Sequence, residues 1–211
     1  MADDSPDLRA AVIATAREMN AVGINRGKSG NVSARIDRGF LVTPSAMPYA
    51  EMESDDIVAI AGDGTPSGRR PPSSEWRFHR DIYAARSEVA AIVHTHSPFA
   101  TALACLDRGI PAFHYMIAVA GGVDVRCASY ATFGTQALSD AVLRALDGRT
   151  ACLMAHHGMI AVGASLAKAL ALAVEVETLA EMYWRALQIA EPRILTKEEM
   201  EQVLAKFAAY R

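Results

Sequence analysis

Histidines in two short clusters are the residues of this chain best suited to chemistry. The first cluster is His94-Thr95-His96, and the second is the adjacent pair His156-His157. A zinc ion with three protein ligands and one open position is the catalytic kind, and neutral imidazoles are good ligands for it. The two clusters together could supply three such ligands. We therefore predict a catalytic metal site that holds Zn²⁺, although Co²⁺, Mn²⁺ or Fe²⁺ would also suit these ligands.

The spacing within each cluster limits which rings can meet at one ion. Residues two apart in a strand point to the same side, so His94 and His96 converge if the strand over 89–93 continues through them. The neighbours His156 and His157 face opposite ways on extended backbone, and only one of them should bind. His79 and His114 lie outside both clusters, and we expect them to be ordinary hydrogen-bonded polar residues.

A carboxylate and two hydroxyls precede the first histidine cluster at Ser73-Ser74-Glu75. The serines lie at a predicted helix start, where free backbone N–H groups favour an anion. Lys28, in a glycine-rich turn, could add a point charge for a phosphate, and the loop with Ser45 could form another wall. Each loop alone is typical of an ordinary turn or cap, and neither matches a nucleotide-binding pattern. With the histidines, they indicate metal-assisted chemistry on a small phosphorylated substrate.

Composition excludes several classes of protein. The length of 211 residues fits one domain over 1–211. The net charge of −3 gives no sign of the basic surface that binds nucleic acid. No apolar run reaches the ~18 residues of a membrane span, and the acidic start of the chain is unlike a secretory signal. The three cysteines, Cys105, Cys127 and Cys152, are odd in number and unclustered. They predict reduced, core-packing thiols in a cytoplasmic protein.

The elements that must position these residues alternate between helix and strand. Helical spacing, caps and stops predict helices over 6–22, 135–146, 165–189 and 200–209, with two more beginning after Ser74 and at Ser97-Pro98. Alternating or short apolar runs predict strands over 32–36, 40–42, 57–60, 89–93, 151–155 and 159–162. Several strand pairs are joined by short turns. This favours a mixed or antiparallel sheet covered by helices over a doubly wound parallel sheet.

Taken together, these motifs resemble the class II aldolase/adducin family, and they follow in order along nearly the whole chain. The matching pieces are Gly30-Asn31-Val32-Ser33, Ser73 to His79, His94-Thr95-His96, Pro111 to Ala118, Tyr130 to Thr135 and His156-His157-Gly158. The resemblance implies an α/β fold of three layers with a mostly antiparallel central sheet. It also implies a homotetramer with active sites between neighbouring subunits.

The resemblance assigns roles to individual residues. It implies that His94, His96 and His157 bind the metal and that Glu75 is the catalytic acid/base, which can also touch the metal before the substrate arrives. Tyr115 matches a tyrosine that the adjacent subunit contributes.

The phosphate pocket carries over by resemblance to Asn31, Ser45, Ser73 and Ser74, with Lys28 at a further lining position. Two departures stand out. Lys28 occupies a place where similar members have a small hydroxyl residue, and Ser45-Ala46 replaces a Thr-Gly pair. Both changes still permit phosphate binding, but they alter the shape of the pocket.

The activity implied is reversible retro-aldol cleavage of a ketose 1-phosphate to dihydroxyacetone phosphate and an aldehyde, with the metal as Lewis acid. L-fuculose 1-phosphate and 5-deoxy- or 5-methylthio-pentulose 1-phosphates are the expected substrates, and the residues do not separate them. Tyr210 matches a tail tyrosine near the site. Two alternatives stay within the family: a pentulose-phosphate 4-epimerase, or a dehydratase or decarboxylase. The least favoured alternative is a structural adducin-like protein, because such members lack the metal histidines that this chain has.

Overall fold

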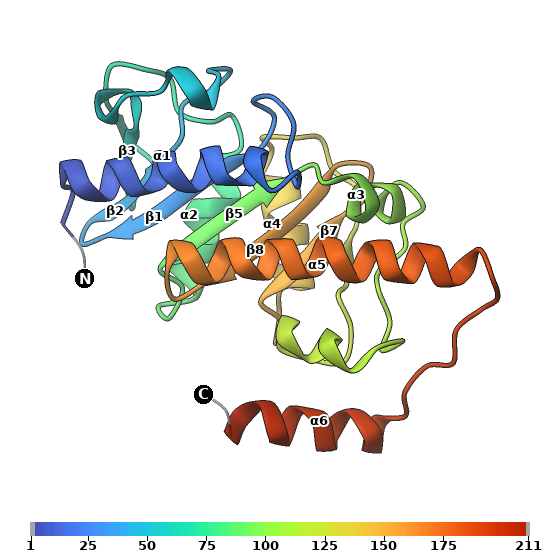
Figure 1. The fold of residues 1–211 in the computed structure, drawn as a ribbon. Coiled ribbons are helices and arrows are strands. Elements are labelled where there is room, and N and C mark those ends of the chain that lie inside the picture. Colours follow the sequence, from blue (N-terminus) through green and yellow to red (C-terminus); the bar gives the residue numbers. More distant parts are fainter. Residues whose placement is uncertain (1–2, 210–211) are drawn as a thin grey trace.

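An eight-stranded sheet runs through the middle of the protein in our computed structural model, which describes residues 3–209 (Figure 1). Its strands are β1 (Asn31–Ile36), β2 (Gly39–Val42), β3 (Val58–Ala61), β4 (Pro66–Ser67), β5 (Ala91–Thr95), β6 (Cys127–Ala128), β7 (Ala151–Met154) and β8 (Gly158–Gly163). Their order across the sheet is β4-β3-β2-β1-β5-β8-β7-β6. Six neighbouring pairs are antiparallel, and the two-residue strand β6 runs parallel to β7.

Six α-helices and three short 3₁₀ segments surround the sheet within residues 3–209. The helices are α1 (Pro6–Ala21), α2 (Trp76–Ala85), α3 (Pro98–Ala104), α4 (Gln136–Ala145), α5 (Leu166–Leu187) and α6 (Lys197–Ala209). The 3₁₀ segments are η1 (Tyr49–Glu51), η2 (Ser54–Asp56) and η3 (Tyr115–Ala120). Side-chain hydroxyls begin three of the helices: Ser5, Thr135 and Ser165 each accept a backbone N–H of the first turn.

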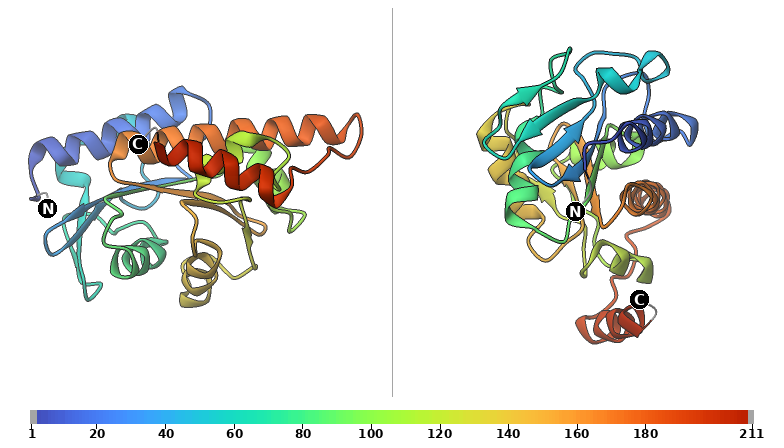
Figure 2. Two further views of the ribbon diagram at one scale, coloured as in Figure 1. Left: turned by 90° about the horizontal axis from the view of Figure 1, so that it is seen from below. Right: turned by 90° about the vertical axis from the view of Figure 1, so that its left-hand side faces the viewer.

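The helices lie in two layers, one on each face of the sheet (Figure 2). Alternation along the strands decides which face each side chain meets. In β1, Val32 and Ala34 join the core under α1 and α5, whereas Ser33 lies on the opposite side and contacts α2. In β5, Ile92 belongs to the core under α2 and α4. The predicted three-layer α/β fold with a mostly antiparallel sheet is confirmed.

The short helix α3 is held at both ends by other elements. Its N-cap residue Ser97 makes no side-chain capping bond. The buried carboxylate of Glu177 on α5 does this instead, accepting the backbone N–H groups of Phe99 and Ala100 at 2.8 and 2.9 Å. At the other end, the carbonyl of Ala104 accepts the backbone N–H of His156 at 3.1 Å. Helix α3 thus connects the two histidine segments, because it begins two residues after His96 and ends against His156.

Several sequence-based boundaries need correction. Helix α2 begins at Trp76 with Glu75 as its N-cap, so the expected cap by the preceding serines is wrong. Ser73 instead turns the chain just before the helix, where its carbonyl accepts the N–H of Trp76. Helix α6 begins three residues earlier than expected, although the expected reciprocal capping bonds of Thr196 and Glu199 are present. Strands β4 and β6 were not expected, because two-residue strands carry no periodicity.

Two sequence-based expectations concern other parts of the molecule. No helix within residues 3–209 is long and apolar enough to cross a membrane. The tail residue Tyr210 lies outside the described residues.

The role of Glu177 can be tested by its removal. Glu177→Ala leaves two N–H groups at the start of α3 without their partner, and we expect the free energy of unfolding to fall by about 1–2 kcal/mol. Glu181→Ala is the matched control on the same helix, because its pairing with Arg185 is exposed and worth at most about 0.5 kcal/mol. Urea unfolding followed by circular dichroism measures both. Equal losses in the two variants would show that the cap contributes nothing.

Candidate active site

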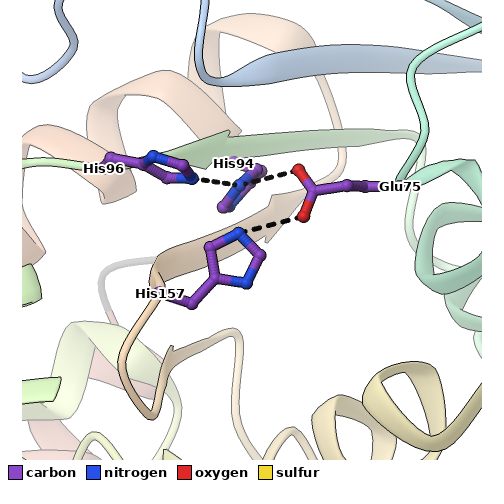
Figure 3. A group of neighbouring side chains, drawn as sticks. All are labelled: Glu75, His94, His96 and His157. Atoms are coloured by element: carbon purple, nitrogen blue, oxygen red, sulfur yellow. Dashed lines mark hydrogen bonds and ion pairs between the residues drawn. The ribbon is translucent and has the colours of Figure 1, made fainter. Parts of the chain in front are cut away.

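Four side chains from distant parts of the chain meet at one point on the α2 side of the sheet (Figure 3). They are Glu75, His94, His96 and His157, whose ligand atoms all lie within 4.8 Å of one another. The Nε2 atoms of His94 and His96 are 3.1 Å apart. Glu75 places Oε2 3.1 Å from His94 Nε2 and Oε1 2.9 Å from His157 Nε2. This is the one group of three or more such ligands found within residues 3–209.

Each of the four residues lies at the end of an element, where a side chain can reach the common point. His94 is in β5, and His96 follows one residue after that strand ends. Glu75 directly precedes α2. His157 lies in the turn between β7 and β8, so the extended backbone assumed for the His156-His157 pair is wrong.

The turn separates the two adjacent histidines by a backbone change at one residue. His156 has φ 53°, in the left-handed region, and its half-exposed ring lies 3.7 Å from a carboxylate oxygen of Asp107. His157 faces Glu75. The expected division of the pair is therefore present, and it results from a left-handed turn.

Two glycines let neighbouring backbone approach the histidine strand closely. A Cβ at Gly30 would lie 2.5 Å from the carbonyl oxygen of His94. A Cβ at Gly158 would lie 2.5 Å from the Thr95 carbonyl oxygen and 2.9 Å from Cδ2 of the His96 ring. Real Cβ contacts are essentially never that short. The backbone around His94 and His96 therefore packs at a distance that only glycine allows.

The hydrogen bonds of His94 fit a metal ligand. Its Nδ1 lies 2.8 Å from the Met159 carbonyl oxygen and must donate a proton to it, which leaves Nε2 to face the cluster. This is the usual outer contact of a metal-binding histidine. Glu75 Oε1 is buried and has no well-aligned hydrogen bond from any described residue. The His94 and His96 Nε2 atoms, 3.1 Å apart beside this buried carboxylate, form a set of ligand atoms that could hold a divalent cation.

The groups of the cluster shift one another's pKa values. Burial alone would lower the pKa of His94, but the Glu75 carboxylate and the Met159 carbonyl raise it. Burial alone would raise the pKa of Glu75, but the neighbouring His94 and His157 hold it well below its usual value. Burial, followed by repulsion from His94 and His157, lowers the pKa of His96 to about 4. A carboxylate and a neutral imidazole are the forms that bind metal.

The loops predicted to hold phosphate lie together beside the cluster. Ser73 and Thr43 are joined by a backbone hydrogen bond of 3.1 Å, and Ser45 donates its N–H to the Pro71 carbonyl at 3.0 Å. The Lys28 ammonium donates to the Ala46 carbonyl at 2.9 Å, which ties a third loop to this pair.

Asn31 connects the loops to the cluster. Its buried side-chain NH₂ donates to Ser73 Oγ at 3.1 Å and to Glu75 Oε2 at 3.0 Å. Ser74 is exposed and lines the cavity in front of Glu75. The structure therefore brings together the five predicted residues Lys28, Asn31, Ser45, Ser73 and Ser74.

A buried carboxylate anchors the segment that leads into the serines. Asp56 accepts side-chain hydrogen bonds from Arg69 and Arg70 at 3.0 and 2.9 Å. Burial alone would raise the pKa of Asp56, but Arg70, the backbone N–H of Glu53 and Arg69 lower it to about 2. The ionised carboxylate thus fixes the chain just before Pro71.

A cavity of about 300 Å³ opens in front of the cluster. It is lined by Ser29, Ser74, Glu75, His96, Tyr130, Ala131, Phe133, His156 and His157. Tyr130 and Phe133 are 63% and 65% exposed, and sequence reasoning gave them no role. The signal was available, because Tyr130 to Thr135 is one of the pieces that resemble the family. Arg77 holds this segment near α2 by donating to the Gly134 carbonyl at 2.8 Å.

Other candidate residues lie outside the cluster. Tyr115 begins η3, is 51% exposed and does not line the cavity. His114 precedes it and accepts the N–H of Met116 on Nδ1. His79 is fully buried and hydrogen-bonded on both ring nitrogens, as expected for a polar residue without metal.

Comparison with known proteins matches most of the chain to one family. Residues 10–184 match the model of the class II aldolase and adducin N-terminal domain. A 5-methylthioribulose-1-phosphate/5-deoxyribulose-1-phosphate aldolase of Rhodospirillum rubrum is 58% identical over 203 residues, which cover 96% of this chain and 92% of that protein. The L-fuculose phosphate aldolase of Escherichia coli K12 is 48% identical over 200 residues, with 94% and 93% covered.

The fold also matches a solved structure closely. A structure of L-fuculose 1-phosphate aldolase superposes with a TM-score of 0.94 at 39% sequence identity, and 97% of each chain is covered. The similarity therefore extends over the sheet and both helical layers.

The close packing at Gly158 predicts a selective loss of metal affinity. Gly158→Ala forces the Thr95 carbonyl and the His96 ring to move, and we expect the affinity for Zn²⁺ or Co²⁺ to fall by about tenfold to a hundredfold, as for lost outer-shell support. Gly62→Ala is the control, because a Cβ there meets nothing within 4 Å. Competition titration with a chromophoric chelator measures both affinities. An unchanged affinity in Gly158→Ala would mean that the His96 position is not fixed by this contact.

Proposed function

Because the chain belongs to the class II aldolase and adducin family, we propose that it is a metal-dependent lyase that cleaves a ketose 1-phosphate to dihydroxyacetone phosphate and an aldehyde. The observation that carries the proposal is the meeting of Glu75 and three histidines beside a serine-lined pocket. Relatives at 58% and 48% identity are aldolases of such phosphorylated sugars. The free cysteines suit a reducing cytoplasm.

Zn²⁺ is the metal we assign to His94, His96 and His157, with Glu75 as a further ligand before substrate binds. Three imidazoles with an open position suit zinc. When bound, the metal acts as a Lewis acid that stabilises the negative charge which develops as the C3–C4 bond breaks.

Glu75 transfers the proton at C3. In the synthetic direction its carboxylate removes a proton from C3 of dihydroxyacetone phosphate, and in the cleavage direction the same group returns it. The lowered pKa of Glu75 keeps the carboxylate ionised, which is the form that removes a proton. A well-placed acid/base of this kind contributes about 10²–10⁴-fold to the rate.

The phosphate of the substrate binds the loops beside Glu75. The hydroxyls of Ser45, Ser73 and Ser74 and the NH₂ of Asn31 supply neutral donors, and the Lys28 ammonium adds a charge. Lys28 is exposed and donates to the Ala46 carbonyl, and within residues 3–209 it forms no ion pair. It can therefore turn to a phosphate at the cost of one hydrogen bond.

The aldehyde half of the substrate occupies the aromatic side of the cavity. Tyr130, Ala131 and Phe133 line it and suit a small apolar end group such as a methyl or methylthio group. We therefore favour 5-methylthio- and 5-deoxy-pentulose 1-phosphates, in agreement with the relative at 58% identity, over more polar ketose phosphates.

Tyr115 acts from a neighbouring subunit of a homotetramer. Its 51% exposure and its absence from the lining of this chain's cavity support this assignment. In the synthetic direction the Tyr115 hydroxyl donates its proton to the C4 oxygen as the carbonyl is attacked. In the cleavage direction the Tyr115 phenolate takes that proton from the C4 hydroxyl, so that the aldehyde carbonyl can form.

Product analysis tests the function. The zinc-loaded protein, incubated with 5-methylthioribulose 1-phosphate, 5-deoxyribulose 1-phosphate and L-fuculose 1-phosphate, should release dihydroxyacetone phosphate and the matching aldehyde. Removal of the metal by a chelator should abolish release, and added Zn²⁺ should restore it. Coupled reduction of dihydroxyacetone phosphate measures the rate, and NMR identifies both products. A new ketose phosphate in place of an aldehyde would identify an epimerase and contradict the proposal.

Mixed tetramers test the shared site. Glu75→Gln and Tyr115→Phe should each lose about 10²–10⁴-fold in turnover. If Glu75 of one subunit works with Tyr115 of another, co-expression of the two variants with different tags should restore a substantial fraction of wild-type activity in the doubly purified hybrid. Hybrids of Glu75→Gln with a Glu75→Gln, Tyr115→Phe double variant are the control and should stay inactive. Absence of recovery in the first hybrid would contradict a site between subunits.

A further inference from the structure

A line of buried polar side chains runs beneath α2 and ends at Glu75. Tyr83 Oη lies 2.8 Å from Ser33 Oγ, and Ser33 Oγ lies 2.7 Å from His79 Nδ1. His79 Nε2 lies 2.6 Å from Asn31 Oδ1, and Asn31 Nδ2 donates to Glu75 Oε2 at 3.0 Å. All five side chains are buried, with exposed fractions of 0–6%, so water does not take part in these bonds.

The charge of Glu75 sets the direction of every bond in the line. An ionised carboxylate only accepts hydrogen bonds, so Asn31 must turn its NH₂ toward Glu75 and its carbonyl oxygen toward His79. His79 must then carry its proton on Nε2, which leaves Nδ1 as an acceptor. Ser33 therefore donates to His79.

The far end of the line is fixed by the same rule. The Ser33 hydroxyl donates its one hydrogen to His79, so its oxygen accepts the hydrogen bond from the Tyr83 hydroxyl. Every donor in the line thus points toward the carboxylate, and bonds aligned in this way polarise one another.

The neutral form of His79 is maintained by its surroundings. Burial, followed by repulsion from His94, lowers the pKa of His79 to about 3. The ring packs against Phe78 and Phe40, with centroids 4.7 and 6.2 Å away. It is therefore a fixed, uncharged ring with one defined tautomer.

Two local sequence patterns bring these buried polar side chains together. Asn31 and Ser33 are two apart in β1 and point to the same face of the sheet, while His79 and Tyr83 are four apart and share one face of α2. An Asn-x-Ser strand facing a His-x₃-Tyr helix is what brings the groups into contact.

We propose that His79 is a positioning residue, which together with Ser33 and Tyr83 locks the amide of Asn31 so that it holds Glu75 in place for proton transfer. The inference rests on the proposed function of Glu75. The second N–H of Asn31 donates to Ser73. The same lock therefore also sets one wall of the phosphate pocket, and it fixes the acid/base relative to the phosphate.

The tautomer of His79 gives a test that needs neither metal nor turnover. Nitrogen NMR of histidine-labelled protein distinguishes Nε2–H from Nδ1–H, and metal-free wild-type protein should show His79 as the Nε2–H form, neutral at pH 6–8. His79→Gln identifies the signal. An Nδ1–H form or a charged ring would overturn the proposal, whatever the substrate of the enzyme.

Proton transfer at Glu75 gives the second test. Exchange of the C3 hydrogen of dihydroxyacetone phosphate with deuterated solvent needs the acid/base but no aldehyde and no C–C cleavage. Ser33→Ala removes the donor to His79, and exchange should slow by about tenfold, the effect of one lost hydrogen bond in such a line. Tyr83→Phe, one bond further away, should slow it less.

Ser139→Ala is the matched control. Ser139 is also fully buried and donates to a carboxylate, Asp81, but it lies outside the line. Both serine variants should lose similar thermal stability, whereas only Ser33→Ala should lose exchange at full zinc content.

These experiments distinguish failure of the His79 proposal from failure of the proposed function. Equal exchange in Ser33→Ala and Ser139→Ala would leave Ser33 and His79 as structural residues only and overturn the proposal. If Ser33→Ala does not fold, the Tyr83→Phe rate and the wild-type tautomer decide in the same way. Wild-type protein without any exchange contradicts the proposed function, while the tautomer measurement still decides whether the lock exists.

Discussion

A buried negative charge organises this protein. The carboxylate of Glu75 is 6% exposed, and an isolated ion at such depth would cost several kcal/mol of folding free energy. Three kinds of group offset that cost: the rings of His94 and His157, the NH₂ of Asn31, and the cation for which the cluster is suited. His94 and Asn31 are in turn held by further bonds, and through Asn31 the polar network extends from the cluster to Tyr83, near the C-terminal end of α2.

The sheet supplies the geometry that this network needs. Antiparallel pairing sets Asn31 of β1 opposite His94 of β5, and β8 on the other side of β5 delivers the Met159 carbonyl to the same ring. Helix α3 links the chain after His96 to the turn that carries His157. Small residues at Gly30 and Gly158 permit these elements to approach. Rigid elements on several sides of the cluster, rather than one flexible loop, thus define the positions of the proposed metal ligands.

Local features of this fold could be predicted from the sequence, and long-range ones could not. The caps at Ser5, Thr135 and Ser165 involve groups three residues apart, so the sequence shows both partners. The metal-site residues could be proposed because His-x-His has a distinctive spacing, and the family resemblance supplied Glu75 and the choice of His157. The contact between His79 and Asn31 depends on how α2 lies on β1, which no local pattern specifies. The aromatic wall of Tyr130 and Phe133 was missed for the same reason, since its meaning depends on what lies across the cavity.

The wide separation of the ligands along the chain has a thermodynamic consequence. Glu75, His94, His96 and His157 come together only when β5, β8 and α2 are all in place, so the unfolded chain has no comparable site. Metal binding and folding are therefore one linked equilibrium. Each tenfold rise in free metal above the dissociation constant adds about 1.4 kcal/mol to the stability of the folded protein. With a metal bound at the proposed site, resistance to unfolding and proteolysis would therefore rise with the free metal concentration, and metal shortage would lower the amount of folded protein as well as its activity.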